Sequence, residues 1–448
     1  MADRKKLLLI LPRNERGYWG KVSKSGKAGF VRLSLPQLAA LTPEDWDVEI
    51  LDSRITPVDF KKKADLVGIT AFTAEIPSAY AIADGFRKNG VKVVMGGVHV
   101  SALPEEALRH ADSVVAGEAE AVWRDVLDDF SKDALKPVYR AGRLIEMKGM
   151  PVPRRDLLDR KLYVSGFNTL QATRGCPFGC EFCAVTAFFG EKFRTRPVGE
   201  VIDEIQGFDT RDFFFLDDNI AGKPPYAKEL FKALIPLKRT WGGQTSITIA
   251  KDDELLGLYA KSGGKYAFIG FESLSEATLK RMNKSWNSPD GYRESIRKIH
   301  SAGINIIGSF VFGFDEDDPS VFKNTFDFIM ENNVDAAQFN ILTPFPGTKL
   351  YDALEKEGRI TDRDWAKYNT GEVVFRPVCM GPEELLRGYH WIFRNTYSIK
   401  NILKRSLRSP SGIAYRIVVN LSWRKKAHRM PRVGALNFSG AGRKAAGV

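Results

Sequence analysis

The chain has 448 residues, of which 44% are hydrophobic and 27% charged, so it is long enough for two or three globular domains with cores of ordinary size. No run of eighteen apolar residues occurs, which excludes a predicted membrane-spanning helix. The net charge of +12 is concentrated at one end, because 14 Lys and Arg and no Asp or Glu follow Glu384. The first 384 residues therefore carry a net charge of about −2. The overall charge does not by itself predict nucleic-acid binding.

Residues 1–140 are predicted to form an α/β domain with a parallel sheet. The first apolar run, Leu7–Leu11, ends at Pro12 and is too short for the apolar part of a signal peptide, so we expect a buried strand there. Helical patterns such as Ser78–Lys88 and Pro104–Arg109 separate the later apolar runs. This alternation is typical of a doubly wound, Rossmann-like (flavodoxin-like) sheet. Further strands are expected at Val48–Leu51, Asp65–Thr70, Lys92–Met95 and Ser113–Ala116.

Small and polar residues follow three of these strands, at the edge where such sheets bind ligands. They are Thr70 with Thr73, the segment Gly96-Gly97-Val98-His99, and the segment Gly117-Glu118-Ala119-Glu120. No GxGxxG motif follows the first strand, which disfavours a dinucleotide. From these residues alone, a plain Rossmann-like domain stays open as an alternative.

Residues 141–165, with Pro151 and Pro153, are expected to be a linker. The strand–helix alternation begins again in residues 166–380, which predicts a partly open (β/α)6 barrel of the TIM type with its site at the carboxyl ends of the strands. Its six strands are expected at Phe167–Ala172, Phe213–Leu216, Ser246–Ile249, Tyr266–Phe271, Ile304–Phe312 and Ala336–Leu342.

Three of the four cysteines, Cys176, Cys180 and Cys183, lie within eight residues after the first of these strands. Pro177 and Gly179 disfavour a helix, so the segment should be a loop that can curve around a compact inorganic group. A structural zinc site requires four ligands, and a disulfide uses two cysteines. The triplet therefore indicates an iron–sulfur cluster with one open iron, as a catalytic metal site requires, in a reducing cytoplasm.

The CxxxCxxC spacing, with Phe182 before the last cysteine, resembles the signature of radical S-adenosylmethionine (SAM) enzymes. The resemblance implies a 4Fe–4S cluster on the three cysteines, SAM bound to the open iron, and a one-electron donor such as flavodoxin or ferredoxin. Phe182 would pack near the adenine. The other residues expected to contact SAM are Asp217, Asp218, Glu272, Gly308 and Gly313. The acids among them follow or end barrel strands, and as an alternative each could be the N-cap of the following helix.

The segments at 96–106 and 114–120 resemble the cobalamin-binding domain that precedes the barrel in a subgroup of these enzymes. Many cobalamin domains supply an axial histidine from a DxHxxG motif after the first strand, but residues 12–37 contain no histidine. Either cobalamin binds without a protein imidazole, or the domain has lost its cobalamin. His99 is expected to be an ordinary hydrogen-bonding group. The resemblance implies a cobalamin site near Thr70, Thr73, Gly96, Gly97, His99 and Glu118.

Together the resemblances extend over residues 1–395 and imply a cobalamin-dependent C-methyltransferase that acts on an unactivated carbon through a 5′-deoxyadenosyl radical. No nucleophile triad or acid–base pair is visible, which agrees with chemistry carried by cofactors. One alternative is a radical cyclase or oxidative enzyme of tetrapyrrole, lipid or natural-product biosynthesis. Another, from a different class, is a cobalamin or iron–sulfur sensor or carrier without turnover.

Residues 381–448 are expected to form a basic helical tail. A helical pattern begins near Leu385, and an apolar stretch, Ile413–Trp423, precedes Arg424-Lys-Lys426. Such a segment can lie on an anionic membrane surface, and a solvated tail with one docked helix is the alternative. Nucleic acid is disfavoured because stacking aromatics are not interleaved with the charges. We expect a cytoplasmic protein that acts on a small molecule or lipid, with peripheral membrane contact left open.

Overall fold

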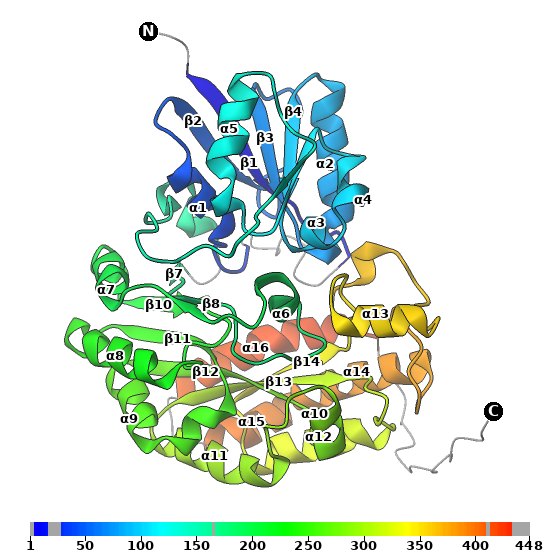
Figure 1. The fold of residues 1–448 in the computed structure, drawn as a ribbon. Helices are drawn as coiled ribbons and strands as arrows, with labels where there is room; N and C mark the ends of the chain where they lie inside the picture. Colours follow the sequence, from blue (N-terminus) through cyan, green and yellow to red (C-terminus); the bar gives the residue numbers. More distant parts are fainter. Residues whose placement is uncertain (1–3, 17–27, 164–165, 409–412, 432–448) are drawn as a thin grey trace.

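The computed structural model describes residues 4–16, 28–163, 166–408 and 413–431. Within these residues two six-stranded sheets lie one above the other, with the N-terminal sheet at the top of Figure 1. A short antiparallel pair, β8 (Thr173–Arg174) with β9 (Arg194–Thr195), lies in sequence between the first two strands of the second sheet and frames the cysteine loop. The predicted α/β class is confirmed, with the chain divided between two parallel sheets.

The first sheet has the strand order β2-β1-β3-β4-β5-β6, and every neighbouring pair is parallel. This order begins as in flavodoxin-like folds, which confirms that part of the prediction. The sixth strand was not predicted, because it follows Pro137 in a stretch that reads as connector. The strands are β1 (Lys5–Leu11), β2 (Trp46–Asp52), β3 (Leu66–Thr70), β4 (Lys92–Gly96), β5 (Ser113–Ala116) and β6 (Val138–Arg140).

Strand β1 shows why this sheet carries helices on both faces. Leu7, Leu9 and Leu11 are buried in one core cluster, whereas Leu8 and Ile10 are buried in another. Alternate side chains of a strand point to opposite faces, so a continuous apolar run requires cover on both. The first face is covered by α1 (Ser34–Leu41) and α5 (Trp123–Ser131), and the second by α2 (Ile76–Lys88), α3 (Val98–Ala102) and α4 (Pro104–Leu108).

The second sheet has the order β14-β13-β12-β11-β10-β7, so its strands follow the chain and are all parallel. The edge strands β7 and β14 do not pair, which makes the predicted partial barrel open on that side. Its strands are β7 (Asn168–Leu170), β10 (Asp212–Phe215), β11 (Thr240–Thr245), β12 (Gly264–Glu272), β13 (Asn305–Phe312) and β14 (Ala336–Ile341). The helices between them are α7 (Val198–Gln206), α8 (Pro224–Leu234), α9 (Asp253–Lys261), α10 (Glu276–Arg281), α11 (Pro289–Ser301) and α12 (Ser320–Glu331).

The third barrel strand was predicted in the wrong place. Residues 246–249 do not form a strand; a 3₁₀ helix covers Ile247–Lys251, and the strand is β11. Its centre is Gly242-Gly243, where a Cβ on Gly242 would lie 3.0 Å from atoms of Phe214 and of Tyr266 on the neighbouring strands. The aromatic side chains of β10 and β12 therefore occupy the space that a side chain of β11 would need, and the glycines hide the strand from an apolar pattern.

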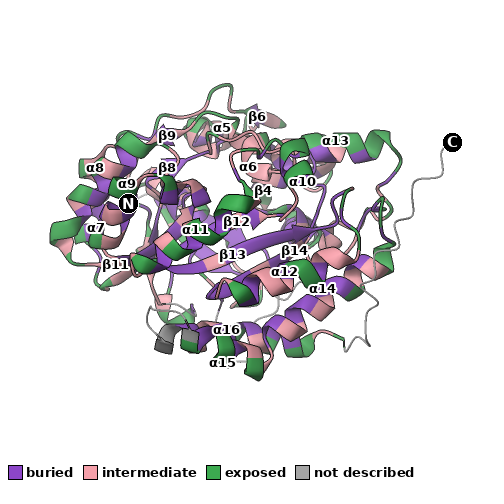
Figure 2. Ribbon diagram, turned by 90° about the horizontal axis from the view of Figure 1, so that it is seen from below, coloured by how far each residue is buried: buried purple, intermediate pink, exposed green. Residues whose placement is uncertain are grey.

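The basic C-terminal segment is not a loose appendage. Helix α14 (Pro382–Thr396) packs along β14, and α15 (Ile399–Arg408) and α16 (Ile413–Arg429) follow, with buried faces towards the barrel core (Figure 2). Arg405 and Arg416 are buried, and Arg405 donates to the carbonyl of Val334 and to Asn420. No helix of the described residues is long and apolar enough to cross a membrane.

The stretch between the sheets is tied to both. Tyr163 donates to Asp52 of the first domain at 3.0 Å, and the backbone N–H of Gly149 donates to Glu200 on α7. Two 3₁₀ turns, Arg155–Leu157 and Arg160–Leu162, lie within it. The proposed boundaries at residues 140, 165 and 380 stay predictions.

We expect Tyr397→Phe to destabilise the second domain, because the Tyr397 hydroxyl bonds both the N–H and the carbonyl of Ala337 on β14. Removing it leaves two buried backbone groups without a partner, at a cost of about 1–3 kcal/mol and several degrees in Tm. Differential scanning calorimetry measures the change. Tyr389→Phe is the control, since the hydroxyl of this tyrosine on α14, which Tyr397 directly follows, has no hydrogen bond to the described residues. Equal shifts in Tm would contradict the prediction.

Candidate active site

The three clustered cysteines lie in a loop that leaves β8 and ends at α6 (Ala184–Phe189). All three thiols are free and partly accessible. Burial raises the pKa of Cys176 to about 11 and that of Cys180 to about 12, and it also raises the pKa of Cys183. The Cys183 thiolate adds to the shift of both neighbours, so the three sulfur atoms lie close enough to interact. Thiolates are the form that binds iron, so cluster binding at these cysteines would release protons.

Two aspartates at the end of β10 support the chain that enters this loop. Asp217 is 0% exposed and accepts hydrogen bonds from the Ala172 N–H and from the N–H and hydroxyl of Thr173. Asp218 accepts the N–H of Gly175 at 3.2 Å. Burial raises the pKa of Asp217 to about 7 and that of Asp218 to about 6.

These contacts change the interpretation of both aspartates. The next helix, α8, begins at Pro224, so neither Asp217 nor Asp218 is the N-cap that was considered as an alternative. The Asp217 oxygens accept three donors inside the protein, which gives Asp217 a role in supporting the cysteine loop, and its predicted contact with SAM stays untested. Asp218, beside the loop entrance, keeps its prediction.

Glu272 ends β12 and forms an ion pair with Lys284, whose Nζ lies 2.7 Å from the Glu272 Oε1. Glu272 has φ of +63°, a left-handed conformation that non-glycine residues adopt rarely and often at functional sites. Burial alone would lower the pKa of Lys284, but the Glu272 carboxylate outweighs it, and the Cys180 and Cys183 thiolates add to the upward shift. A buried ammonium thus lies between the glutamate and the cysteine loop.

Phe182, before the last cysteine, packs on the barrel core and meets the Phe314 ring edge-on, with ring centroids 6.1 Å apart. Phe178 of the same loop stacks on Trp286 with centroids 4.0 Å apart. Aromatic side chains therefore flank the cysteine loop on two sides.

The two predicted glycines of β13 and its end contribute to packing. A Cβ on Gly308 would lie 3.1 Å from the rings of Phe271 and Phe310, and one on Gly313 would lie 2.8 Å from Leu385 of α14. Gly313 also has φ of +104°. Neighbouring side chains occupy the space that a side chain at Gly308 or Gly313 would need, which explains why both residues are glycine. The predicted approach of these glycines to SAM stays untested.

The first sheet gathers most of the residues predicted for cobalamin at the carboxyl ends of β3 and β4. Gly97 has φ of +103°, and a Cβ there would lie 2.7 Å from the Ala71 carbonyl oxygen and 2.8 Å from the Thr70 hydroxyl. Gly96 precedes it at the end of β4, and Thr73 begins the turn after β3. The expected loop without histidine, residues 12–37, includes residues 17–27, which lie outside the described part of the chain.

His99 is a hydrogen-bonding group inside the first domain. Its side chain is fully buried, and its Nε2 lies 3.4 Å from Glu106. Glu106 also accepts from the Tyr80 hydroxyl at 2.9 Å and from the Trp365 indole N–H at 3.0 Å. Because Trp365 lies in a 3₁₀ turn after α13 (Lys349–Lys356), this network joins the first domain to the segment that follows the second sheet. The Nδ1 atom of His99 is buried without a partner among the described residues.

Glu118 follows β5 at the carboxyl edge of the first sheet, but its carboxylate is engaged by partners within the protein, and its predicted contact with cobalamin stays untested. Its carboxylate accepts from Arg174 at 2.8 Å, from Arg194 at 2.7 Å and from the Ile145 N–H. Burial alone would raise the pKa of Glu118, but Arg194 and Arg174 outweigh it and hold the pKa below its usual value. Arg174 also pairs with Glu120. The oxygens of Glu118 are therefore used to join the first domain to the two strands that frame the cysteine loop.

The two candidate edges face each other. Helix α3, which begins directly after Gly97, packs against α6, which begins directly after Cys183 (Figure 1). The turn of residues 344–348 also meets α3, since a Cβ on Gly347 would lie 3.2 Å from the Ala102 Cβ. The predicted cobalamin residues and the cysteine loop are therefore on adjoining surfaces of the two domains.

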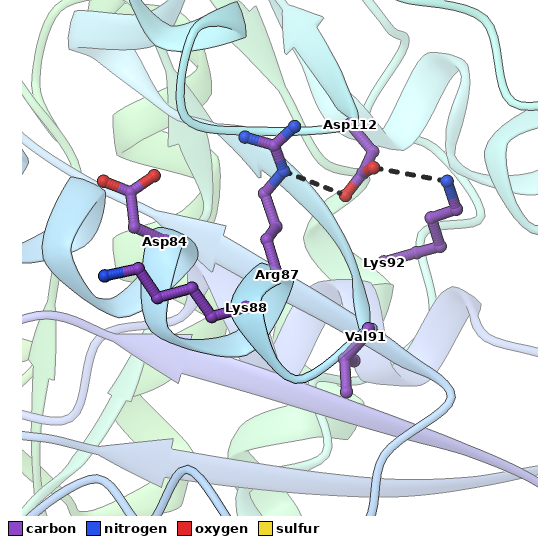
Figure 3. Close-up of a pocket in the computed structure, with 7 residues that line it drawn as sticks. Asp84, Arg87, Lys88, Val91, Lys92 and Asp112 are labelled. Carbon is purple, nitrogen blue, oxygen red and sulfur yellow. Dashed lines mark hydrogen bonds and ion pairs between the residues drawn. The ribbon is translucent and has the colours of Figure 1, made fainter.

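A surface depression on the first domain lies at the other end of its sheet. Figure 3 shows Asp112, just before β5, between Arg87 and Lys92, with its carboxylate 3.5 Å and 3.3 Å from their nitrogens. Lys92 begins β4, so this depression is at the amino ends of the strands, opposite Gly96 and Gly97. Parallel sheets bind ligands at the carboxyl ends, and the ion pairs account for the charged lining.

Family models match three parts of the chain. Residues 31–127 match the B12 binding domain, residues 170–329 match the radical SAM superfamily, and residues 348–430 match a domain of unknown function, DUF4070.

Relatives of similar length extend the match to nearly the whole chain. The bacteriochlorophyllide d C-12(1)-methyltransferase of Chlorobaculum tepidum is 35% identical over 420 residues, which cover 91% of each chain. The bacteriochlorophyllide d C-8(2)-methyltransferase of the same organism is 31% identical, over 90% of this chain and 93% of the relative. This chain belongs to the cobalamin-dependent radical SAM methyltransferases. The hopanoid C-2 methylase of Rhodopseudomonas palustris is more distant, at 26% identity over 81% of this chain and 73% of the methylase.

A solved structure shares the fold of this methyltransferase. The radical SAM methyltransferase TsrM from Kitasatospora setae, with tryptophan substrate and a SAM analogue bound, has a TM-score of 0.69, and the match covers 95% of this chain and 99% of that one. Its identity is 14%, so the likeness concerns the fold alone.

A 4Fe–4S cluster, SAM and cobalamin are the cofactors of this methyltransferase family, and the described residues fit them. Cys176, Cys180 and Cys183 are free thiols in one accessible loop, and in the described residues the fourth cysteine, Cys379, is exposed and lies far along the chain. Three ligands for four irons leave one iron for SAM. At the other edge, Thr70 and Ala71 leave no room for a side chain at Gly97, and the buried Nδ1 of His99 two residues later has no hydrogen-bond partner among the described residues.

Sequence reasoning missed three charged residues of the methyltransferase site. Lys284 lies twelve positions after its partner Glu272, and Arg174 and Arg194 lie more than fifty positions from Glu118. Arg174 lies two residues before Cys176, and this closeness to the cysteine motif was the available signal for it.

We expect Cys183→Ala to abolish cluster binding and SAM cleavage, because two cysteines cannot hold a four-iron cluster at three corners. Iron and acid-labile sulfide are measured after anaerobic reconstitution, and 5′-deoxyadenosine after reduction. Cys379→Ala, which removes an exposed thiol outside the loop, is the control and should retain both. A variant at Cys183 that keeps full iron and cleaves SAM would refute the assignment.

Glu118→Gln should destabilise the contact between the two domains. The change leaves buried Arg194 without its acidic partner, and breaking a buried pair from one side costs about 3–5 kcal/mol. Glu120→Gln is the matched control, because Glu120 pairs with Arg174 alone and is more exposed. Thermal unfolding should show a larger drop in Tm for Glu118→Gln than for Glu120→Gln. Equal drops would refute the role of Glu118 in the contact between the domains.

Proposed function

We propose that this methyltransferase adds a methyl group to a peripheral carbon of a chlorophyll-type tetrapyrrole. The observation that carries the proposal is the 35% identity over 91% of both chains to a bacteriochlorophyllide d methyltransferase, with a second such enzyme at 31%. The hopanoid methylase is less similar, which ranks a polycyclic lipid second as substrate class. Neither relative fixes which carbon this enzyme methylates.

The surroundings of the cysteine loop support a flat, largely apolar substrate. The stacked rings of Phe178 and Trp286 are partly accessible, as are Phe188 and Phe189 on α6, whose ring centroids lie 4.7 Å apart. Aromatic faces provide large apolar contact area for a macrocycle. Arg174 and Arg194 lie over the Phe189 ring at 5.7 Å and 5.6 Å, so positive charge is held next to this aromatic pair.

When bound, the cluster with SAM supplies a 5′-deoxyadenosyl radical, and cobalamin supplies a methyl group. The protein holds the cluster with SAM, the cobalamin and the substrate in fixed positions relative to one another. Cys176, Cys180 and Cys183 would bind three irons, and Asp217 and Asp218 fix the backbone that leads to them. Glu118 joins the cobalamin side to the same backbone through Arg174.

We assign SAM recognition to the Glu272–Lys284 pair as part of this proposal. The methionyl group of SAM carries an ammonium and a carboxylate, and the pair presents one charge of each sign beside the cysteine loop. Both side chains are mostly buried, so their charges are only weakly screened by solvent. Phe182 and Asp218 stay the predicted contacts for the remainder of SAM.

The proposal also includes a one-electron donor such as flavodoxin or ferredoxin, since the radical reaction must begin with an electron from outside the chain. A radical cyclisation or oxidation with the same cofactors is the alternative reaction, and a sensor without turnover is the alternative from another class. Nucleic acid is not proposed as a partner.

The test is methyl transfer from SAM labelled in its methyl group to bacteriochlorophyllide d, with reconstituted enzyme, cobalamin and a reductant. We expect labelled product together with 5′-deoxyadenosine, and no label with Cys183→Ala. A hopanoid is the comparison substrate; label there and not in the tetrapyrrole would reject the substrate class. Formation of 5′-deoxyadenosine with an unlabelled, altered tetrapyrrole would favour the alternative reaction, and no SAM cleavage would favour the sensor.

A further inference from the structure

Helix α15 presents an apolar stripe to solvent. Ile399, Leu403 and Leu407 lie four residues apart on one face and are 56%, 46% and 71% exposed. Residues at this spacing lie above one another on a helix surface. The opposite face carries Ile402 and Arg405, which are buried against the barrel. The helix is therefore anchored by one side, and the exposed stripe is not needed for its own packing.

Positive charge runs beside the stripe. Lys400 and Lys404 are exposed and lie one position after Ile399 and Leu403, so they form a parallel row along the same helix. No Asp or Glu follows Glu384 in the chain, so the tail itself supplies no carboxylate for these lysines. A row of ammonium groups next to a row of Ile and Leu is the pattern of helices that lie in a membrane interface.

The neighbouring helix repeats the arrangement. Helix α16 packs against α15, and Figure 2 shows the two next to each other along one edge of the molecule. Val418 and Leu421 on α16 are 67% and 44% exposed, and Lys425 lies exposed one turn after Leu421. The buried positions of α16, such as Asn420 and Trp423, fix this helix to the barrel as Arg405 fixes α15.

The chemistry of this face selects a lipid surface over the other occupants. A second copy of the chain would bring the lysines of two tails together, because a twofold interface joins equal surfaces. Nucleic acid would require aromatic side chains between the charges, and the stripe has aliphatic ones. An anionic bilayer accepts both rows at once, since aliphatic side chains enter the acyl boundary and lysine stems reach back to the headgroups.

We propose that the outer faces of α15 and α16 dock this enzyme on anionic lipid bilayers, with Ile399, Leu403 and Leu407 inserted and the lysines on the headgroups. The docking is peripheral, and it holds for any substrate. The tail then has two sides with separate functions: one completes the barrel core, and the other binds the membrane surface.

The test is co-flotation of the full-length protein with vesicles of phosphatidylcholine containing about 30% phosphatidylserine, compared with pure phosphatidylcholine. We expect binding to the anionic vesicles, weakened by salt, and a reduction of roughly tenfold or more in Leu403→Asp/Leu407→Asp. Val152→Asp/Val378→Asp is the matched control with the same change in net charge, because both valines lie outside α15 and α16 and are 54% and 59% exposed. Both changes are at exposed positions, and circular dichroism verifies the fold.

The charge contribution has its own pair of variants. Lys400→Glu/Lys404→Glu should lose binding to the anionic vesicles, whereas Lys61→Glu/Lys63→Glu, with the same change in net charge at exposed positions of the first domain, should keep it. Equal loss in both pairs, no binding by the unaltered protein, or equal binding to both vesicle types would overturn the proposal. If light scattering shows a dimer that Leu403→Asp/Leu407→Asp converts to a monomer, the membrane proposal is overturned in favour of a second copy of the chain.

Discussion

A buried carboxylate between two arginines governs how the parts of this enzyme meet. Glu118 comes from the loop after β5, Arg174 from the strand two residues before Cys176, and Arg194 from the strand that closes the same loop. Charges removed from water are tolerated only with close, hydrogen-bonded partners, so this contact has few alternative geometries. The same three side chains therefore contribute both to the docking of the first domain and to holding the two strands that frame the cysteine loop.

The elements with strong local patterns could be predicted from the sequence, and those defined by distant neighbours could not. The run Leu7–Leu11 was found because a strand buried on both faces must be apolar throughout. Strand β11 was misplaced because its glycines make room for aromatic rings of β10 and β12, which a single segment cannot reveal. The three cysteines carried their chemistry in their spacing, whereas the roles of Glu118 and Lys284 depend on partners brought close by folding.

The tail shows how composition can mislead about location. Its excess of Lys and Arg suggested a basic helical tail on a membrane surface or in solvent with one docked helix. In the structure, however, Arg405 and Arg416 are buried and bond to backbone carbonyls, and Arg394 bonds the end of α16. A guanidinium has five donors and can satisfy several carbonyls at once, which suits it to hold helices together where their ends leave oxygens unpaired. The exposed lysines and the buried arginines of one segment thus serve different purposes.

The pairing of β8 with β9 has a consequence for how the metal centre is assembled. Thr173 pairs with Thr195 and Arg174 with Arg194, so residues 175–193 form a loop whose two ends are already joined. Bringing together the ends of a free segment of that length costs roughly 2–3 kcal/mol of chain entropy, and the contacts of the strand pair help to offset it. The base of the loop is thus closed by backbone pairing and not by the cysteines, so cluster ligands are needed only within the loop itself.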